Sequence, residues 1–271
     1  MTNAALFITR NAIAFPKLYT MNRSHLLAAA LFLLMNAKSN FTFGQTNMQK
    51  FEIGAGLSSF IYQGDLTPER LGSSKTMRFG INLYGSRIIS PAFSLRTNLA
   101  IGGLRGDDAK YKVPEYRQQR SFNFRTPVIE LSQLVVWNPL RSNYNDKGFY
   151  PYLFGGVGIN FLKIQRDWSK YNAEYFNASG EDVSARLALD TAHALPRVIP
   201  VIPLGAGMRY NLSQRLALNL EGSYRMSFTD YLDGFSQAAN PARNDHYHTI
   251  TISAVYRIGK RNTFDCPVVK Y

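Results

Sequence analysis

The segment from Arg215 to Phe228 places an apolar residue at almost every second position. The apolar positions are Leu216, Leu218, Leu220, Tyr224, Met226 and Phe228, and polar residues such as Glu221 and Arg225 stand between them. Because successive side chains of a strand point to opposite faces, this period predicts a β-strand with one apolar and one polar face. A soluble sandwich uses such strands too, but the aromatic end of the apolar face favours lipid on one side and water or ion pairs on the other.

Seven further segments have a similar pattern. The eight predicted strands cover residues 49–62, 76–88, 92–104, 122–137, 149–163, 198–210, 215–228 and 246–258. Connections after the first, third, fifth and seventh are long, those after the second and sixth are a few residues, and that after the fourth is intermediate. Long and short connections alternate in this way in outer-membrane barrels, whose long loops lie outside the cell.

The sequence therefore predicts an all-β fold, an eight-stranded antiparallel transmembrane β-barrel with short periplasmic turns and long extracellular loops. The third long loop contains residues 181–195, whose apolar spacing predicts a short helix that Pro196 ends.

The strongly apolar run Leu26–Met35 is about half of the roughly 20 residues that a spanning helix needs, so no transmembrane helix is predicted. Arg23 and His25 precede it and Thr42-Phe43-Gly44 follows, which is the order of a secretory leader. We expect residues 1–44 to be a signal peptide, with an N-terminal extension if Met21 is the true start. Residues 45–271 would then form the barrel domain with a periplasmic tail, 259–271. The alternative is that the run is a buried helix.

The chain carries 31 Lys and Arg against 18 Asp and Glu, an excess that in a soluble protein suggests nucleic-acid binding. The basic residues are scattered and no nucleic-acid motif accompanies them, so no nucleic-acid partner is predicted. Several stand in one predicted loop, namely Arg105, Lys110, Lys112, Arg117 and Arg120. They suit an anionic lipid or polysaccharide surface, or a solvated loop that binds nothing.

Seven charged residues of the predicted strands stand on the polar face. They are Glu52, Glu130, Glu221, Arg78, Arg96, Arg209 and Arg225. A charge at the lipid midplane costs roughly 2 to 4 kcal/mol, so this face points inward. Eight strands close a barrel that side chains fill, and buried charges need partners. We therefore predict an ion-pair network in a plugged lumen, with a solute pathway as the alternative.

His193, His246 and His248 are the histidines beyond the leader. With Asp230 and Asp245 nearby, His246 and His248 would suit a metal site or a lipid-hydrolase dyad. No Gly-x-Ser-x-Gly motif accompanies them. A structural role at the rim is the preferred interpretation, so no catalytic residue, metal or cofactor is predicted.

The single cysteine, Cys266, lies in the tail after the last predicted strand. With no second cysteine in the chain it forms no internal disulfide. An unpaired periplasmic thiol is the simplest expectation, and pairing with another protein is the alternative.

Four short motifs carry a family resemblance: Tyr62-Gln63-Gly64-Asp65-Leu66, residues 150–158 (YPYLFGGVG), Thr229-Asp230-Tyr231-Leu232-Asp233, and Cys266-Pro267. The chain resembles the small outer-membrane β-barrel proteins of Bacteroidota that include PorG, a component of the type IX secretion system. The resemblance implies an integral outer-membrane protein with lipid around it and periplasmic secretion-system proteins as possible partners. No small-molecule substrate is predicted.

The loop motif residues Gly64, Asp65, Asp230, Tyr231 and Asp233 stand where strands leave the membrane. Glycine lets the chain turn and aspartate bonds to nearby backbone N–H groups, so these residues are expected to order the loops. Direct contact with a partner is the alternative. Three functions remain: a non-enzymatic envelope scaffold associated with type IX secretion, which is preferred, a small-solute or ligand-binding transport barrel, and a membrane-embedded enzyme.

Overall fold

The computed structural model describes residues 51–145, 147–180, 182–241 and 244–258. The predicted leader, the tail 259–271 and its Cys266 lie outside these residues. The described chain belongs to one compact unit, residues 47–271.

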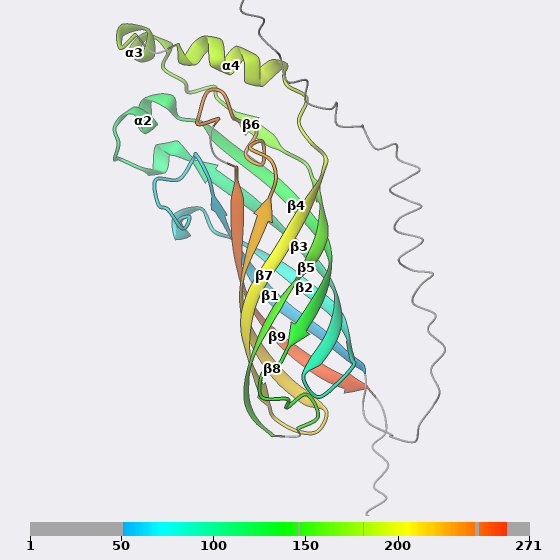
Figure 1. The fold of residues 1–271 in the computed structure, drawn as a ribbon. Coiled ribbons are helices and arrows are strands. Elements are labelled where there is room, and N and C mark those ends of the chain that lie inside the picture. The colour runs from blue at the N-terminus through cyan, green and yellow to red at the C-terminus, as the bar shows by residue number, and fades with distance from the viewer. Residues whose placement is uncertain (1–50, 146, 181, 242–243, 259–271) are drawn as a thin grey trace, which may run out of the picture. The chain divides into compact units, whose positions relative to one another are not determined.

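Eight long strands form a closed antiparallel barrel (Figure 1), and the predicted fold class is confirmed. Each strand pairs with its neighbour in the chain, and β1 also pairs with β9, which closes the ring. The strands are β1 (Phe51–Gln63), β2 (Arg78–Ile88), β3 (Phe93–Asp107), β4 (Asn123–Trp137), β5 (Gly148–Leu162), β7 (Val198–Asn211), β8 (Leu216–Ser227) and β9 (His246–Ile258).

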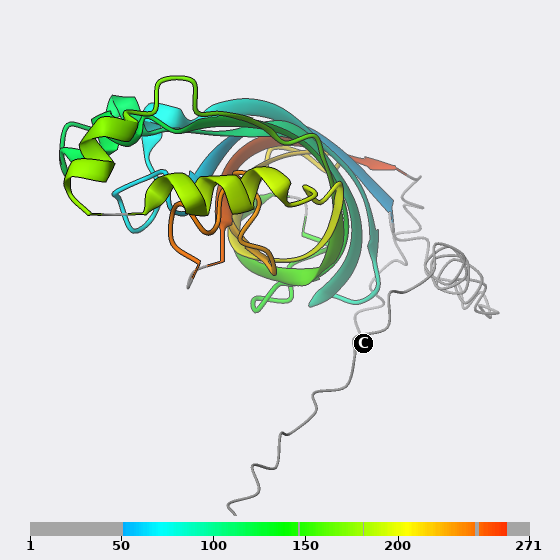
Figure 2. The same cartoon turned by 90° about the horizontal axis from the view of Figure 1, so that it is seen from above.

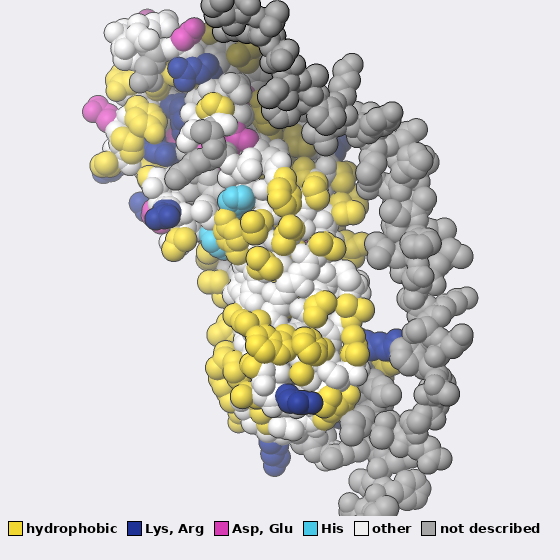
Figure 3. Space-filling view, in the orientation of Figure 1, with side chains coloured by type: hydrophobic (Ala, Val, Ile, Leu, Met, Phe, Trp, Pro, Cys, Tyr) yellow, Lys and Arg dark blue, Asp and Glu magenta, His cyan; other side chains and the backbone are white. Residues whose placement is uncertain are grey.

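Apolar side chains cover the outer wall of the barrel (Figure 3). On β1 and β2, Leu57 is 71% exposed and Phe79 is 78% exposed, while Glu52 and Asn82, on the opposite parity, are buried inside. Such an exterior is unfavourable in water and favourable in lipid. The protein is therefore an integral barrel of the outer membrane, with lipid as the solvent of its wall.

The short and long connections lie at opposite ends of the barrel, which we name the turn end and the loop end. The loop end carries two 3₁₀ turns, η1 (Ser74–Thr76) and η2 (Asp108–Lys110), the short strand β6 (Gln165–Asp167), and the helices α2 (Tyr116–Arg120), α3 (Ala173–Ala178) and α4 (Val183–Ala192). Seen along the barrel axis, α4 crosses over part of the mouth (Figure 2). Among the described residues, no helix is both long and apolar enough to cross a membrane.

The helix predicted in the third long loop is confirmed as α4. Asp182 caps its first turn by accepting a hydrogen bond from the backbone N–H of Ala185 (3.3 Å), and Pro196 follows its end. Strand β3 runs to Asp107, three residues beyond its predicted end, because Gly103–Asp107 pair with Asn123–Pro127 of β4. The β3–β4 hairpin continues beyond the lipid-facing wall. There the outer face is no longer in lipid, so the sequence does not alternate between apolar and polar residues.

A hydrophobic core joins the loops to the top of the lumen. Its buried members come from strands, loops and helices, including Phe60, Leu104, Phe122, Phe124, Phe176, Leu187, Leu232 and Phe235. The rings of Phe122 and Phe235 stack with centroids 4.4 Å apart. This cluster makes the loop end a folded cap, since burial of several aromatic side chains offsets the entropy of ordering long loops.

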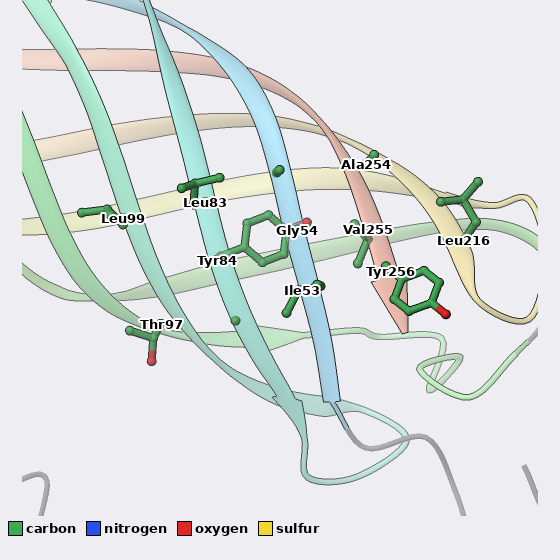
Figure 4. Close-up of a pocket in the computed structure, with 12 residues that line it drawn as sticks. Ile53, Gly54, Leu83, Tyr84, Thr97, Leu99, Leu216, Ala254, Val255 and Tyr256 are labelled. Atoms are coloured by element: carbon green, nitrogen blue, oxygen red, sulfur yellow. The ribbon is translucent and has the colours of Figure 1, made fainter. Parts of the chain in front are cut away.

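An apolar hollow of about 560 Å³ lies on the lipid side of the barrel wall (Figure 4). It lies over β1, β2 and β9 and reaches β3 and β8, where the small residues Ala55, Gly85 and Ala254 leave space between Leu83, Leu216 and Tyr256. Behind it, the Tyr84 ring lies against Gly54, where a Cβ atom would overlap the ring. Glycine at position 54 therefore lets the Tyr84 ring lie across the inner side of β1, where its hydroxyl accepts a hydrogen bond from Asn219 on β8.

Candidate functional site: a layered lumen beneath an acidic cap

The lumen holds three groups of ion pairs, stacked from the turn end to the loop end. The first is centred on Glu52, which accepts hydrogen bonds from Arg209 Nη1 (2.8 Å) and Nη2 (2.7 Å) and from Arg257 Nε (3.0 Å). Arg257 also donates to the backbone oxygens of Asn143 (3.1 Å) and Asn145 (2.9 Å) in the turn below. One carboxylate thus holds two guanidinium groups, and the second arginine is shared with backbone oxygens.

The second group is centred on Arg96 and Glu221, which form a buried ion pair. Glu221 also accepts a hydrogen bond from the Tyr152 hydroxyl (2.5 Å). The Arg96 guanidinium lies 4.3 Å from the centre of the Tyr84 ring, and Asn219 Nδ2 donates to the Tyr84 hydroxyl (2.9 Å). Aromatic rings therefore pack around this arginine and fill the middle of the lumen.

The third group is centred on Glu130, which is fully buried. It accepts hydrogen bonds from Arg225 Nε (3.1 Å), the Tyr247 hydroxyl (2.8 Å) and the Ser132 hydroxyl (2.9 Å). Asn160 Nδ2 donates to the same tyrosine oxygen (2.9 Å). Each of the three carboxylates thus has at least one guanidinium partner and accepts two or more hydrogen bonds, as buried charges require.

The structure places six of the seven lumenal residues singled out from the sequence in these groups. The exception is Arg78, which is half-buried near the loop end and has no acidic partner among the described residues. Arg257 is the cation that sequence reasoning missed. When the barrel closes, the start of β1 lies beside the end of β9, and Glu52 stands opposite Arg257 in the register. Pairing of the first and last predicted strands could therefore have identified Arg257 as a partner of Glu52.

An acidic cluster caps the lumen. The Tyr62 hydroxyl lies 2.7 Å from Asp233 Oδ2 and 2.6 Å from Asp245 Oδ1, and all three residues are fully buried or nearly so. A hydroxyl has one proton, so it satisfies one carboxylate, and the other contact needs a proton on a carboxyl group. Burial, together with the neighbouring carboxylates, holds the pKa of Asp233 and of Asp245 well above the usual range.

Gly64 lies directly beneath this contact. A Cβ atom there would overlap both the Tyr62 hydroxyl and the Asp245 carboxylate, so glycine is required by close approach. Asp245 Oδ2 also accepts hydrogen bonds from the backbone N–H groups of Leu232 (3.1 Å) and Asp233 (3.3 Å). The two loop motifs thus meet at one hydroxyl and order each other.

Asp230 and Tyr231 lie at the edge of the same cap. Burial raises the pKa of Asp230 to about 7, and the carboxylates of Asp65 and Asp190 act in the same direction. The Tyr231 hydroxyl donates to Asp190 Oδ1 (3.2 Å) on α4. Asp190 also accepts from three successive backbone N–H groups, those of residues 236–238, at 2.9–3.2 Å. Sequence reasoning missed Asp190, whose position on a helix far along the chain gave no signal.

Two arginines expected to face an anionic surface are instead buried. Arg117 Nη1 donates to Asp108 Oδ1 (2.8 Å), and Arg120 Nε donates to Asp108 Oδ2 (2.7 Å). Both also donate to the backbone oxygen of Asp65, at 3.1 and 3.4 Å. The expectation of an external partner is wrong for these two, because spacing of three on α2 turns them both toward one carboxylate. Asp65 itself anchors Asn240 through its carboxylate (2.7 Å).

The histidines do not form a site with the nearby aspartates. His246 and His248 are half-buried on β9 and pack against the Tyr224 ring, with centroids 5.3 and 4.9 Å apart. His246 Nδ1 accepts from the backbone N–H of Ser227 (3.3 Å). Asp245 faces inward to Tyr62, so the dyad considered from the sequence is not assembled in the described residues. His193 stacks on Tyr231, with centroids 4.1 Å apart.

A family model described as "Domain of unknown function (DUF6089)" matches residues 25–257. The chain belongs to the DUF6089 family. The search of curated proteins returned no match.

Among solved structures, the DUF6089 chain is similar to Ail, the attachment invasion locus protein of Yersinia pestis (12% identity, TM-score 0.42, covering 78% of this chain and 100% of that one). It is also similar to OprG from Pseudomonas aeruginosa (10%, 0.42, 80% and 100%) and to the outer-membrane enzyme PagL (9%, 0.34, 76% and 99%). The assignment of the DUF6089 barrel to the outer membrane rests on its own apolar wall.

Proposed function

We propose that this protein is a non-enzymatic scaffold of the outer membrane that holds a periplasmic assembly. The observation that carries the proposal is the lumen, which three ion-pair groups and their tyrosines occupy from the turn end to the cap. A barrel filled in this way offers its two ends and its wall to partners. Binding of partner proteins therefore suits this barrel better than transport of a solute through it.

The finer proposal is association with type IX secretion. Its support is the set of motifs shared with the Bacteroidota barrels that include PorG. In the structure the Gly64-Asp65 and Asp230–Asp233 motifs build the cap at the loop end. Their hydrogen bonds are internal, so in this proposal they order the extracellular surface, and the secretion partners meet the periplasmic turns and tail.

The competing transport function requires a path through or around the three ion-pair groups. Each group would have to open and leave charges without partners, which costs several kcal/mol per group. The enzyme alternative requires a nucleophile or a metal beside a suitable base, whereas His246 and His248 pack on Tyr224 and Asp245 is bonded to Tyr62 inside the barrel.

Cys266 provides the experiment that tests the scaffold. Because it is the only cysteine of the chain, a heterobifunctional thiol reagent with a photoactivated second end labels one position. Irradiation of intact cells should give a discrete adduct with a periplasmic protein, and Cys266→Ser should abolish it. Recovery of no adduct, in cells where a surface-exposed loop cysteine placed at Lys112 is labelled normally, would contradict a scaffold that uses the tail.

Deletion of the gene tests the secretion assignment separately. Loss of type IX cargo from the medium, restored by the wild-type chain, is expected. Restoration also by an Asp230→Ala, Asp233→Ala double variant that still reaches the outer membrane would support a loop-ordering role for these aspartates. Normal secretion in the deletion strain would remove the type IX assignment and leave the scaffold to the cross-linking result.

A further inference from the structure

A basic hollow opens where β5 ends and β7 begins. Its volume is about 860 Å³, and Leu162, Lys163, Ile164, Arg166, His193, Ala194, Leu195, Pro196 and Arg197 line it. The lining includes three permanent cations and a histidine, and it includes no Asp or Glu. This composition differs from the acidic cap nearby and suits an anionic ligand.

The backbone brings the two outer cations together. Lys163 directly follows the last residue of β5, and Arg197 directly precedes the first residue of β7. The backbone N–H of Leu162 donates to the carbonyl oxygen of Arg197 (2.8 Å), and that of Lys163 donates to Pro127 on β4 (3.2 Å). Both side chains are exposed, and neither has an acidic partner in the part of the chain that the structure describes.

The third cation forms a fixed inner wall. Arg166 Nη1 donates to the carbonyl oxygen of Gly234 (2.7 Å), and Nη2 donates to that of Thr191 (3.3 Å). The Trp168 ring lies 5.7 Å from the guanidinium carbon. Asp190 and Asp233 are acidic groups that act on this arginine without a salt bridge to it, and backbone N–H donors already surround the Asp190 carboxylate. The positive charge of the hollow is therefore held in place without an ion pair.

The level of the hollow on the barrel identifies the source of the anion. Phe161 and Val198 are partners in the β5–β7 register, and they keep 48% and 53% of their exposure on the lipid-facing wall. Arg197 directly precedes Val198 and Lys163 lies two residues beyond Phe161, so both stand at the outer end of this wall, where the acyl region gives way to headgroups. Ala194, Leu195 and Pro196 add an apolar side to the same hollow.

We propose that this hollow binds the phosphate-bearing headgroup of a lipid of the outward-facing leaflet. Lys163 and Arg197 contact the phosphate, since an ammonium and a guanidinium are the groups that bind it most strongly in proteins. The acyl chains follow the wall below Phe161 and Val198. A basic pocket at the membrane boundary is a recurring way of holding anionic lipids.

The test counts retained lipids by native mass spectrometry. The full barrel, purified in a neutral detergent, is titrated with phosphatidylglycerol or phosphatidylcholine, and sodium phosphate is added in a separate arm. We expect one phosphatidylglycerol to be retained in preference to phosphatidylcholine. The double variant Lys163→Gln, Arg197→Gln should weaken retention by roughly tenfold or more, because two charges that act at the headgroup are lost.

The matched control is Lys147→Gln, Arg215→Gln, which removes two exposed cations at the turn end. It should retain the lipid like the wild type, and heat-dependent gel mobility checks that both variants fold. Equal retention by the Lys163/Arg197 variant, or equal loss in the control, would overturn the proposal. Displacement of the lipid by millimolar sodium phosphate would also overturn it, because the site would then recognise free phosphate and not a lipid.

Discussion

Replacing Glu52 with glutamine tests the energetics of the lumen. The side chain is 4% exposed and accepts three hydrogen bonds from Arg209 and Arg257. Glutamine keeps the shape and loses the charge, so two guanidinium groups remain with no carboxylate between them. Breaking a buried pair by removing one partner costs about 3 to 5 kcal/mol.

We expect a loss near the lower end, about 3 kcal/mol, for two reasons. The Arg209 side chain keeps 12% of its exposure, so water near the turn end partly solvates it. Arg257 also keeps its bonds to two backbone oxygens, which need no carboxylate. At 3 kcal/mol the equilibrium constant for unfolding rises by roughly 150-fold.

The assay is reversible unfolding in urea from phosphatidylcholine vesicles, followed by tryptophan fluorescence. Trp137 on β4 is 43% exposed on the lipid-facing wall and reports insertion. Glu115→Gln, an exposed residue of the cap, is the matched control and should change stability by less than about 0.5 kcal/mol. A loss below about 1 kcal/mol for Glu52→Gln, with folding intact, would refute the interpretation that this carboxylate holds the two cations.

Three further predictions concern the cap and the wall. Burial raises the pKa of Asp230 to about 7, so the folded cap binds a proton more tightly than the unfolded loop does. The stability of the cap should therefore fall as pH rises from about 4 to 7. Hydrogen exchange of residues 229–241 should show more opening at pH 8 than at pH 5, and the difference should be smaller in Asp230→Asn. Tyr62→Phe removes the donor between two buried carboxylates and should destabilise the protein by about 1 to 3 kcal/mol in the same urea assay; no change would contradict the shared contact. In Gly54→Ala the new methyl group overlaps the Tyr84 ring, so the free energy of unfolding should fall by about 1 to 3 kcal/mol. The fall should be smaller when Gly54→Ala is made in a Tyr84→Ala background. Equal falls in both backgrounds would contradict the overlap.

The strands were predictable from the sequence because lipid imposes a strict rule on the outward face. A period of two in apolar residues, with most strand charges on the opposite side, indicated the parity of the strands, and β9 begins and ends at its predicted residues. The same rule ends where the wall leaves the lipid. The extension of β3 to Asp107 and the strand β6 lie beyond that boundary and were missed for that reason.

The partners of charged residues were less predictable than their faces. Arg78 and Arg257 both stand on the polar parity, yet the second forms the ion pair with Glu52, because register and barrel closure decide which charges meet. In the cap, the spacing of three puts Arg117 and Arg120 on one side of α2, but the loop conformation that brings Asp108 to them has no signal in the sequence. Contacts between distant loops depend on tertiary packing, which a single sequence does not display.

Conductance across a planar bilayer tests the central claim, that the lumen is filled and the protein acts by contact. The purified barrel should insert, as judged by protease protection of its strands, and should give no steady openings at any applied voltage. The Glu52→Gln variant provides a comparison in which one ion-pair group is weakened. Large, steady openings of the wild-type protein would contradict the filled lumen and favour a solute pathway.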